Sequence, residues 1–235
     1  MMSPPKASNR SWISFYPRTV APAVVLIAVF LLLAVAVHLR LLADIDLAFA
    51  QSVYYGLDSV VLLYCATATG ILLATQTALI YSLAASLVLW RRGMGIQAFA
   101  PMAFLFGTAV EVLFKIAVNQ PQEPLSEFHR GTFYPFFGLA LNGSYPSGHA
   151  LRTAFFCFFL GALLWSRGGV LPRIVSLGAI PLALFFSFTR LYIGDHWLSD
   201  IVGGLLLGTA IAVLVVPPVA HRLARNVPDP ETNGS

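Results

Sequence analysis

Charged residues are scarce in this sequence. Only 10% of its 235 residues are Asp, Glu, Lys or Arg, against roughly 25% in an average soluble domain, and 58% are hydrophobic. A chain of this composition has too few polar side chains to cover a water-facing surface. The composition therefore excludes an ordinary soluble domain and indicates an integral membrane protein.

Cysteine is nearly absent, and several common motifs are missing. Cys65 and Cys157 both lie in apolar surroundings without metal-ligand spacing, so we predict packing roles and neither a disulfide framework nor a metal site. The net charge is +4, but the basic residues stand singly or in pairs, which argues against a nucleic-acid partner. No Gly-rich phosphate loop and no internal repeat is present, so no nucleotide cofactor is expected.

Long apolar runs fill most of the chain. A helix needs roughly 20 apolar residues to cross a bilayer. Six segments reach or approach this length, at residues 20–42, 68–90, 96–117, 148–166, 170–188 and 198–219. They predict an all-α polytopic membrane bundle of about six helices over residues 20–219, with tails at 1–19 and 220–235. Residues 58–67 extend the second run, either as an interfacial segment or as a tilted part of the span.

The basic residues lie on one side of these spans. They are Lys6, Arg10 and Arg18 before the first span, Arg91 and Arg92 after the second, Arg167 and Arg173 after the fourth, and Arg222 and Arg225 after the sixth. The positive-inside rule then predicts that both termini lie in the cytoplasm. We expect the plasma membrane, because the chain is compact and its polar motifs face away from the cytoplasm. The first run resembles a signal peptide, but no small-residue cleavage site follows it, so we interpret it as an anchor.

A polar segment between Thr189 and Asp200 lies at the mouth of the last predicted span, on the extracytoplasmic side. Arg190 precedes His196 by six positions, and Asp200 follows His196 by four. If the sixth helix begins near His196, Asp200 lies one turn further on the same face. A carboxylate that accepts from one imidazole nitrogen fixes the tautomer and makes the other nitrogen a better nucleophile toward phosphorus. We therefore predict a catalytic His–Asp pair.

A second polar turn, residues 145–149 with the sequence Tyr-Pro-Ser-Gly-His, directly precedes the fourth predicted span. Pro146 favours a turn and Gly148 permits close approach, so the Ser147 and Gly148 amides can point at an anion near the helix start. His149 can donate a proton to a leaving oxygen. Taken alone, this turn is also consistent with a helix cap.

Lys115 lies near the outer end of the third predicted span, on the same side as both histidines. Its ammonium group either extends to the membrane–water interface or contacts a phosphate. Its position on the same side of the membrane as both histidines favours the phosphate contact. Glu111 is one turn earlier and either pairs with Lys115 or faces the bundle interior. We assign Glu111 no catalytic role.

These motifs resemble those of the type 2 phosphatidic acid phosphatase (PAP2) superfamily, which also contains vanadium haloperoxidases and glucose-6-phosphatase-like enzymes. The family pattern is Lys, six residues and Arg-Pro; then Pro-Ser-Gly-His; then Ser-Arg, five residues, His, three residues and Asp. Residues 146–149 match the second motif fully, and Arg190, His196 and Asp200 match the third, with Thr189 in place of Ser. The similarity spans residues 115–200.

The resemblance implies a two-step reaction that needs neither metal nor cofactor. His196 would attack phosphorus to form a phosphohistidine, and Asp200 would orient it. His149 would protonate the leaving group and later activate water. The residues that would hold the phosphoryl oxygens are Lys115, Ser147, Gly148 and Arg190.

The first motif departs from the family pattern. Seven positions after Lys115 the chain has Gln122, followed by Glu123, where the family has Arg-Pro. Glutamine donates hydrogen bonds but supplies no positive charge, and Glu123 adds a negative one. The change either weakens phosphate binding, alters the substrate, or is offset by another cation. The candidates for that cation are Arg130, Arg152 and His129.

The expected function is a membrane lipid phosphatase that removes a terminal phosphate or diphosphate from an amphiphilic lipid. Phosphatidate, phosphatidylglycerophosphate, polyprenyl diphosphate and a phosphoglycolipid all fit. One alternative is a phosphotransferase that passes the phosphoryl group to a lipid or sugar hydroxyl, and another is a catalytically weakened membrane binding protein. The membrane spans argue against a haloperoxidase. The expected partners are the lipid substrate and the bilayer.

Overall fold

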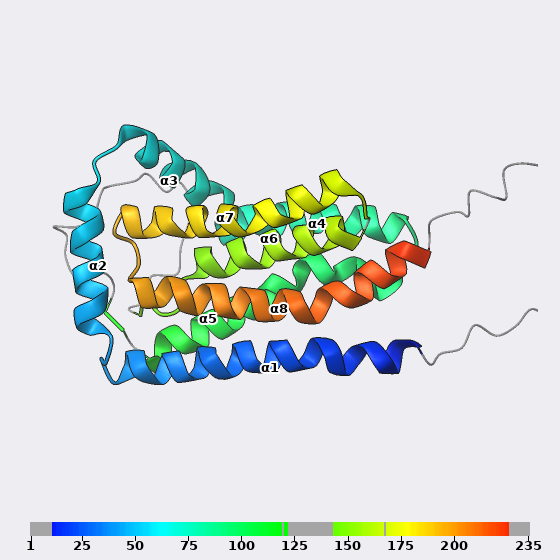
Figure 1. Cartoon of the computed structure of the whole chain (residues 1–235), viewed down its shortest axis with the longest axis horizontal. Coiled ribbons are helices and arrows are strands. Elements are labelled where there is room, and N and C mark those ends of the chain that lie inside the picture. The colour runs from blue at the N-terminus through cyan, green and yellow to red at the C-terminus, as the bar shows by residue number, and fades with distance from the viewer. Residues whose placement is uncertain (1–10, 119, 122–142, 167, 226–235) are drawn as a thin grey trace, which may run out of the picture.

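The chain folds into a bundle of helices (Figure 1). The computed structural model describes residues 11–118, 120–121, 143–166 and 168–225, and in these ranges the regular elements are helices apart from one bridge between Pro121 and Gly143. The elements are α1 (Ser11–His38), α2 (Ala43–Gly56), α3 (Val60–Leu72), α4 (Thr75–Arg91), the 3₁₀ helix η1 (Gly95–Ala103), α5 (Phe104–Val118), α6 (Gly148–Ser166), α7 (Val170–Tyr192) and α8 (Leu198–Arg225).

The helices confirm an all-α, multi-span membrane fold. Five described stretches are long and apolar enough to cross a bilayer, at residues 20–38, 95–118, 148–165, 170–192 and 198–220. The pair α3 and α4 forms a sixth span if it is counted as one broken span. Most of the large apolar side chains on α1, α4 and α7 are exposed, as expected where lipid tails surround the helices.

Two predicted boundaries were wrong, and one helix was not predicted. The second span does not begin at residue 68, because the chain bends by 57° between α3 and α4, where Ala74 has extended backbone angles. The segment 43–56, between the first two predicted spans, is the helix α2. The fifth span continues to Tyr192 instead of ending at 188, so Arg190 lies in the last turn of α7 and not in a connection.

Close packing of α8 against α6 forms the centre of the bundle. Gly204 and Gly208 of α8 face the α6 backbone: a Cβ at Gly204 would collide with the Ser147 carbonyl, and one at Gly208 with the Leu151 carbonyl. Small residues allow helix backbones to approach in a membrane, where dispersion contacts replace the hydrophobic effect as the driving force. The helices α1 and α7 pack against this central pair.

The turn before α6 is anchored by Tyr145. Its ring stacks against Phe30 of α1, with centroids 5.8 Å apart, and its hydroxyl donates to the Phe30 carbonyl oxygen at 3.2 Å. Burial raises the pKa of the Tyr145 phenol, which keeps the hydroxyl protonated as a donor. Tyr145 therefore fixes the position at which α6 begins.

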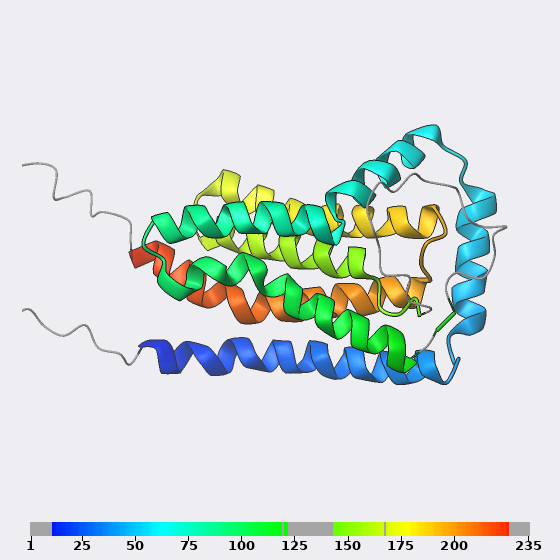
Figure 2. The same cartoon turned by 180° about the vertical axis from the view of Figure 1, so that it is seen from behind.

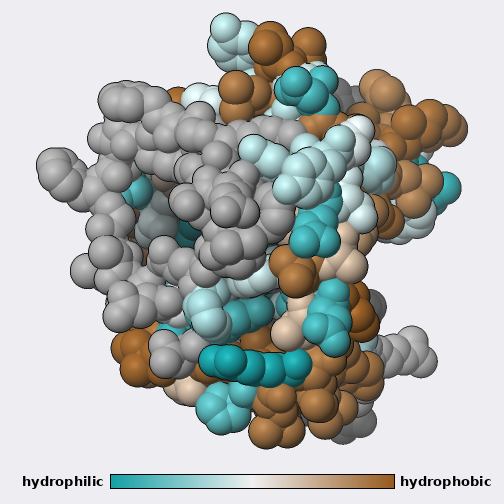
Figure 3. All heavy atoms as spheres, turned by 90° about the vertical axis from the view of Figure 1, so that its left-hand side faces the viewer, coloured by the Kyte–Doolittle hydropathy of each residue, from teal (hydrophilic) through white to brown (hydrophobic). Residues whose placement is uncertain are grey.

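The two ends of the bundle differ. The helix α2 lies across one end, and the first turn of α1 and the last turn of α8 lie together at the other (Figures 1 and 2). On the end that carries α2, hydrophilic residues gather in the uncovered part of the face and hydrophobic residues lie toward its edges (Figure 3). The α6 start, the α7 end and the α8 start all lie on this α2 side, so the predicted motifs meet there.

Candidate active site

A main-chain hydrogen bond joins the two polar motifs. The Ser147 N–H donates to the Asp200 carbonyl oxygen at 3.0 Å, which holds the start of α6 beside the start of α8. The sequence suggested that the Ser147 amide points at an anion. This prediction was wrong, because the amide already donates to the Asp200 carbonyl oxygen. The Gly148 amide, next along the chain, is the remaining backbone donor of this turn, and no partner for it is seen among the described residues.

His196 and Asp200 form the predicted pair. The His196 Nδ1 lies 3.3 Å from Asp200 Oδ2, which leaves Nε2 as the other ring nitrogen. Helix α8 begins at Leu198, the predicted start of the sixth span, and the Trp197 N–H donates to the same Oδ2 at 3.0 Å. Asp200 is fully buried, and Ser144 Oγ donates to its Oδ1 at 3.3 Å. These contacts fix the carboxylate, and the carboxylate fixes the imidazole.

His149 lies among the other charged groups of the site. It is one residue into α6, and its Nε2 is 3.3 Å from the Gly70 carbonyl oxygen near the end of α3. Arg190, His196 and Asp195 lie close enough to His149 to interact with it electrostatically. The two predicted catalytic histidines are therefore within electrostatic range of each other.

Arg190 is fully buried and forms hydrogen bonds both to α3 and to a residue near His196. Its guanidinium donates to the Ala66 carbonyl, to Thr69 Oγ1 at 3.1 Å and to Asp195 Oδ2 at 3.4 Å. Thr189, which replaces the family's Ser, keeps a hydroxyl that contacts Thr69 Oγ1 at 2.9 Å. The departure from the family pattern at Thr189 thus retains a polar link between α7 and α3.

Glu111 connects two cations. Its Oε1 lies 2.9 Å from Lys115 Nζ, and its Oε2 lies 3.3 Å from Arg152 Nη1. The carboxylate also lies against Gly148, where any Cβ would collide with it. Lys115 and Glu111 therefore pair as the sequence allowed, and both lie beneath the turn that begins α6.

Arg152 is the candidate replacement cation that the structure brings into the site. It is 4% exposed, its Nε donates to the Leu73 carbonyl oxygen at 2.5 Å, and it is in electrostatic contact with His149. The other first-motif residues considered, Gln122, Glu123, His129 and Arg130, lie outside the described residues. Within the described part of the chain, no group of three or more His, Cys, Asp and Glu residues is arranged to hold a metal ion.

Asp46 is a site neighbour that the sequence did not reveal. It lies on α2 and is 3% exposed, and its two oxygens accept from the Ser199 N–H at 2.9 Å and the Ser199 Oγ at 2.6 Å. Gln120 Nε2 reaches the same Ser199 hydroxyl at 3.4 Å. Asp46 thereby caps the first turn of α8, the helix that carries Asp200. No local pattern predicts this contact, because it depends on α2 folding across the bundle.

Replacing Asp46 with Asn should flatten the pH dependence of stability. Burial raises the pKa of the Asp46 carboxyl above its ordinary value of 3.8, although the Ser199 donors oppose the shift. A raised folded-state pKa stabilises the protein fully below pH 3.8, and this contribution is lost as pH rises through the raised pKa. Thermal unfolding in detergent over a pH series should show this decline in the parent and not in Asp46→Asn. The exposed Asp44→Asn variant is the control, and parallel parent and Asp46→Asn curves would contradict the expectation.

Comparison with known proteins identifies the family. The model of the PAP2 superfamily matches residues 97–222, which include every catalytic residue proposed above. The chain belongs to the PAP2 superfamily. A solved PAP2 structure, described as the first transmembrane PAP2 type phosphatidylglycerolphosphate phosphatase, from Bacillus subtilis, has a TM-score of 0.66 at 20% identity. It covers 82% of this chain and 93% of that one, and confirms the PAP2 fold.

Three curated proteins share part of this PAP2 sequence. "Putative undecaprenyl-diphosphatase YbjG" of Escherichia coli K12 is 28% identical over 143 residues, which are 59% of this chain and 68% of that protein. Lipid A 1-phosphatase of Rhizobium etli is 32% identical over 119 residues, 48% of this chain and 47% of that one. Undecaprenyl-diphosphatase of Sulfolobus acidocaldarius is 40% identical over 73 residues, 31% of this chain and 32% of that one. The chain thus spans under half the length of the last two.

Proposed function

We propose that this PAP2 protein is a membrane lipid phosphatase acting through a phosphohistidine. The observation that carries the proposal is the His196–Asp200 pair, held beside His149 by the main-chain bond from Ser147 to Asp200. The relatives are named for undecaprenyl diphosphate, lipid A 1-phosphate and phosphatidylglycerolphosphate, which share a phosphate at the polar end of an amphiphilic lipid. The same chemical class is the proposed substrate here.

In the first step, the His196 Nε2 attacks phosphorus as the bond from phosphorus to the lipid oxygen breaks. His149 donates its proton to that oxygen. In the second step, His149 takes a proton from water, the water oxygen bonds to phosphorus, and the N–P bond breaks to release orthophosphate and restore both histidines. Asp200 stabilises the positive imidazole throughout by accepting from Nδ1.

The phosphoryl oxygens are proposed to bind Arg190, Lys115 and the Gly148 amide, with Arg152 adding positive charge behind Glu111. Preorganised donors of this kind stabilise charge that develops in the transition state. The proposed reaction is metal-independent, because side chains supply the cations. Activity in the presence of EDTA is the corresponding test.

The proposed orientation places the site on the extracytoplasmic face of the plasma membrane. Arg91, Arg92 and Arg173 lie at the ends of α4 and α7 remote from α2, together with the first turn of α1 and the last turn of α8. The positive-inside rule assigns that end to the cytoplasm. Single cysteines introduced at Asp44 and at Arg92, in a variant that lacks Cys65 and Cys157, test this orientation: a membrane-impermeant reagent should label the first and not the second on intact cells.

Gln122→Arg tests both activity and the altered first motif. We expect purified protein to release orthophosphate from at least one member of a panel of phosphatidate, phosphatidylglycerophosphate, undecaprenyl diphosphate and lipid A. Restoring the arginine should lower KM about tenfold, since a charged hydrogen bond contributes about 1.5–3 kcal/mol. Gln97→Arg adds the same charge on η1, at the other end of the bundle, and should leave KM unchanged.

The same assay separates the alternatives. A newly phosphorylated lipid or sugar in place of orthophosphate would identify a phosphotransferase. Absence of both products from every lipid would overturn the enzymatic proposal. An unchanged KM in Gln122→Arg would show that another cation, with Arg152 the described candidate, already serves in place of the missing arginine.

A further inference from the structure

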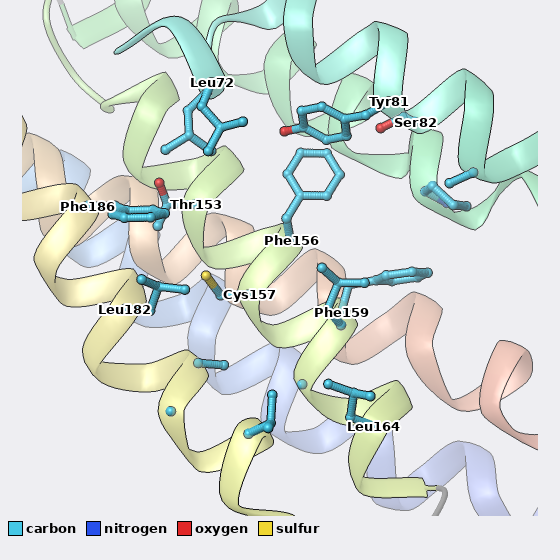
Figure 4. Close-up of a pocket in the computed structure, with 18 residues that line it drawn as sticks. Leu72, Tyr81, Ser82, Thr153, Phe156, Cys157, Phe159, Leu164, Leu182 and Phe186 are labelled. Carbon is cyan, nitrogen blue, oxygen red and sulfur yellow. The ribbon is translucent and has the colours of Figure 1, made fainter. Parts of the chain in front are cut away.

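A large apolar cavity lies between the α3–α4 bend, α6 and α7 and opens to the surface, where its lining residues Leu160, Val175 and Leu182 are exposed (Figure 4). Its volume is about 700 Å³, which lies in the range of about 300–1,000 Å³ typical of small-molecule sites. We call it the inner cavity, and Leu72, Tyr81, Thr153, Phe156, Leu164 and Leu182 are among its lining residues. Apart from a few hydroxyls, its wall is hydrocarbon, so it suits an apolar chain.

The inner cavity begins directly beneath the candidate active site. Thr153 follows His149 by one turn of α6, about 6 Å, and Phe186 precedes Arg190 by one turn of α7. On the third wall, Leu73 lines the cavity while its carbonyl oxygen accepts from Arg152. The cavity extends to Leu164, about 16 Å further along α6. A lipid whose phosphate is at His149 can therefore place one chain in it.

Two buried hydroxyls in this wall need a hydrogen-bond partner. Thr153 is 1% exposed and Ser82 is 0% exposed, and neither side-chain oxygen has a partner among the described residues. Both residues line the inner cavity, and Figure 4 shows Thr153 beside Phe186 below Leu72, with Ser82 next to Tyr81 on the opposite wall. An unsatisfied hydroxyl in an apolar environment is costly, so the site favours a ligand that carries an acceptor at this depth.

The position of Thr153 distinguishes the lipid classes. In an acyl lipid, the ester or amide carbonyl lies a few bonds from the phosphate, which corresponds to one helical turn below His149. In a polyprenyl diphosphate the acceptor oxygens end at the second phosphate, closer to the reacting phosphorus than an acyl carbonyl, and the chain beyond it is hydrocarbon. At the depth of the acyl carbonyl such a lipid offers the Thr153 hydroxyl no acceptor. Sites built to hydrogen-bond a polar group discriminate strongly against analogues that lack it.

We propose that the inner cavity binds one acyl chain of the substrate, with the Thr153 hydroxyl donating to the linkage carbonyl and Ser82 providing a second polar contact. The preferred substrate is then an acyl-linked lipid phosphate and not a polyprenyl diphosphate. This inference rests on the proposed function and specifies its substrate class. It also accounts for the position of the cavity, whose lining residues Thr153 and Phe186 lie one helical turn from His149 and Arg190.

Matched ester and ether lipids test the carbonyl contact. Dioleoyl phosphatidate and its dialkyl ether counterpart differ only by the carbonyls. The parent should show kcat/KM about tenfold higher for the ester than for the ether, and higher for the ester than for undecaprenyl diphosphate. In Thr153→Val, which keeps the side-chain shape, the ester-to-ether ratio should fall to near one. The inference would be overturned if the parent had equal kcat/KM for the ester and the ether, or if it preferred undecaprenyl diphosphate. It would also be overturned if Thr153→Val kept the ester-to-ether ratio of the parent.

Filling the cavity gives an independent test. Gly178 lines the inner cavity about 18 Å along α7 from Arg190, and a Cβ there meets nothing within 4 Å. Gly178→Leu should therefore fold, yet lower the ratio of kcat/KM for dioleoyl to dihexanoyl phosphatidate about tenfold. Gly56→Leu, also without a neighbour within 4 Å but located on α2, should keep the parent ratio. An unchanged ratio in a folded Gly178→Leu would contradict the inference.

The two proposals fail in different ways. If the protein releases orthophosphate from the ether lipid or undecaprenyl diphosphate and does not prefer the ester, it is a phosphatase. The proposed acyl-chain site in the inner cavity is then rejected. If no lipid is turned over, equilibrium binding of the ester and ether lipids to the same protein still measures the preference. A tighter affinity for the ester that disappears in Thr153→Val supports the site without any catalysis, and equal affinities reject it.

Discussion

His196→Ala should abolish lipid phosphate release, lowering kcat on the order of 10⁴-fold or more. The side chain is the proposed nucleophile, and its position is set by Asp200 Oδ2 at 3.3 Å from Nδ1. Removing it deletes the covalent route altogether, whereas the cations that hold the phosphate remain. KM should therefore change much less than kcat, and orthophosphate release from the preferred lipid measures both.

A phosphoenzyme trap tests the same step directly. Parent protein that is quenched during turnover of a lipid labelled in its phosphate should carry acid-labile label, because an N–P bond is formed, and His196→Ala should carry none. His38→Ala is the matched control, since His38 ends α1 and contacts the Val118 carbonyl oxygen at 3.4 Å. Retained turnover in His196→Ala, or label in that variant equal to the parent's, would reject the mechanism.

Asp200→Asn should lower kcat on the order of 10³- to 10⁴-fold with a smaller effect on KM, by analogy with other His–carboxylate pairs. The amide keeps the shape of the carboxylate but carries no charge to stabilise the imidazolium. It also presents a donor where the Trp197 N–H and His196 Nδ1 both require an acceptor. The imidazole is then expected to lose its orientation and adopt the wrong tautomer.

Two comparisons make this result specific to the pair. Asp44→Asn removes a carboxylate from the exposed part of α2 and should retain the parent kcat. A thermal unfolding midpoint measured for Asp200→Asn separates lost chemistry from lost fold, because the buried Asp200 also accepts from Ser144. Near-parental kcat in a folded Asp200→Asn protein would show that Asp200 does not assist His196.

Sequence reasoning predicted the apolar spans well where a polar motif marked their ends. The start of α6 at Gly148 and of α8 at Leu198 were both predicted. The bend between α3 and α4 was not, because no proline or glycine marks Leu73 and Ala74, and α2 was missed because its acidic residues are typical of a loop. Packing between helices, which a single sequence does not show, determines both features.

In the candidate site, too, contacts between residues close in the sequence were predictable and contacts between different helices were not. The His196–Asp200 contact was predictable, since a spacing of four residues at a helix start brings side chains together. The Asp46–Ser199 contact and the Glu111–Arg152 pair were not, because each joins residues on different helices. The occupied Ser147 amide corrected a local interpretation, since its acceptor, the Asp200 carbonyl, is distant in the sequence.

The bend between α3 and α4 has an electrostatic consequence for the resting enzyme. Helix α3 ends beside the site, with the Gly70 carbonyl near His149 and the Leu73 carbonyl accepting from Arg152. The last carbonyls of a helix lack partners of their own and carry roughly half a negative charge. This helix terminus acts as a permanent counter-charge for the cations when no phosphate is bound. In the proposed mechanism it competes with orthophosphate for these cations, and we therefore expect it to weaken retention of the product.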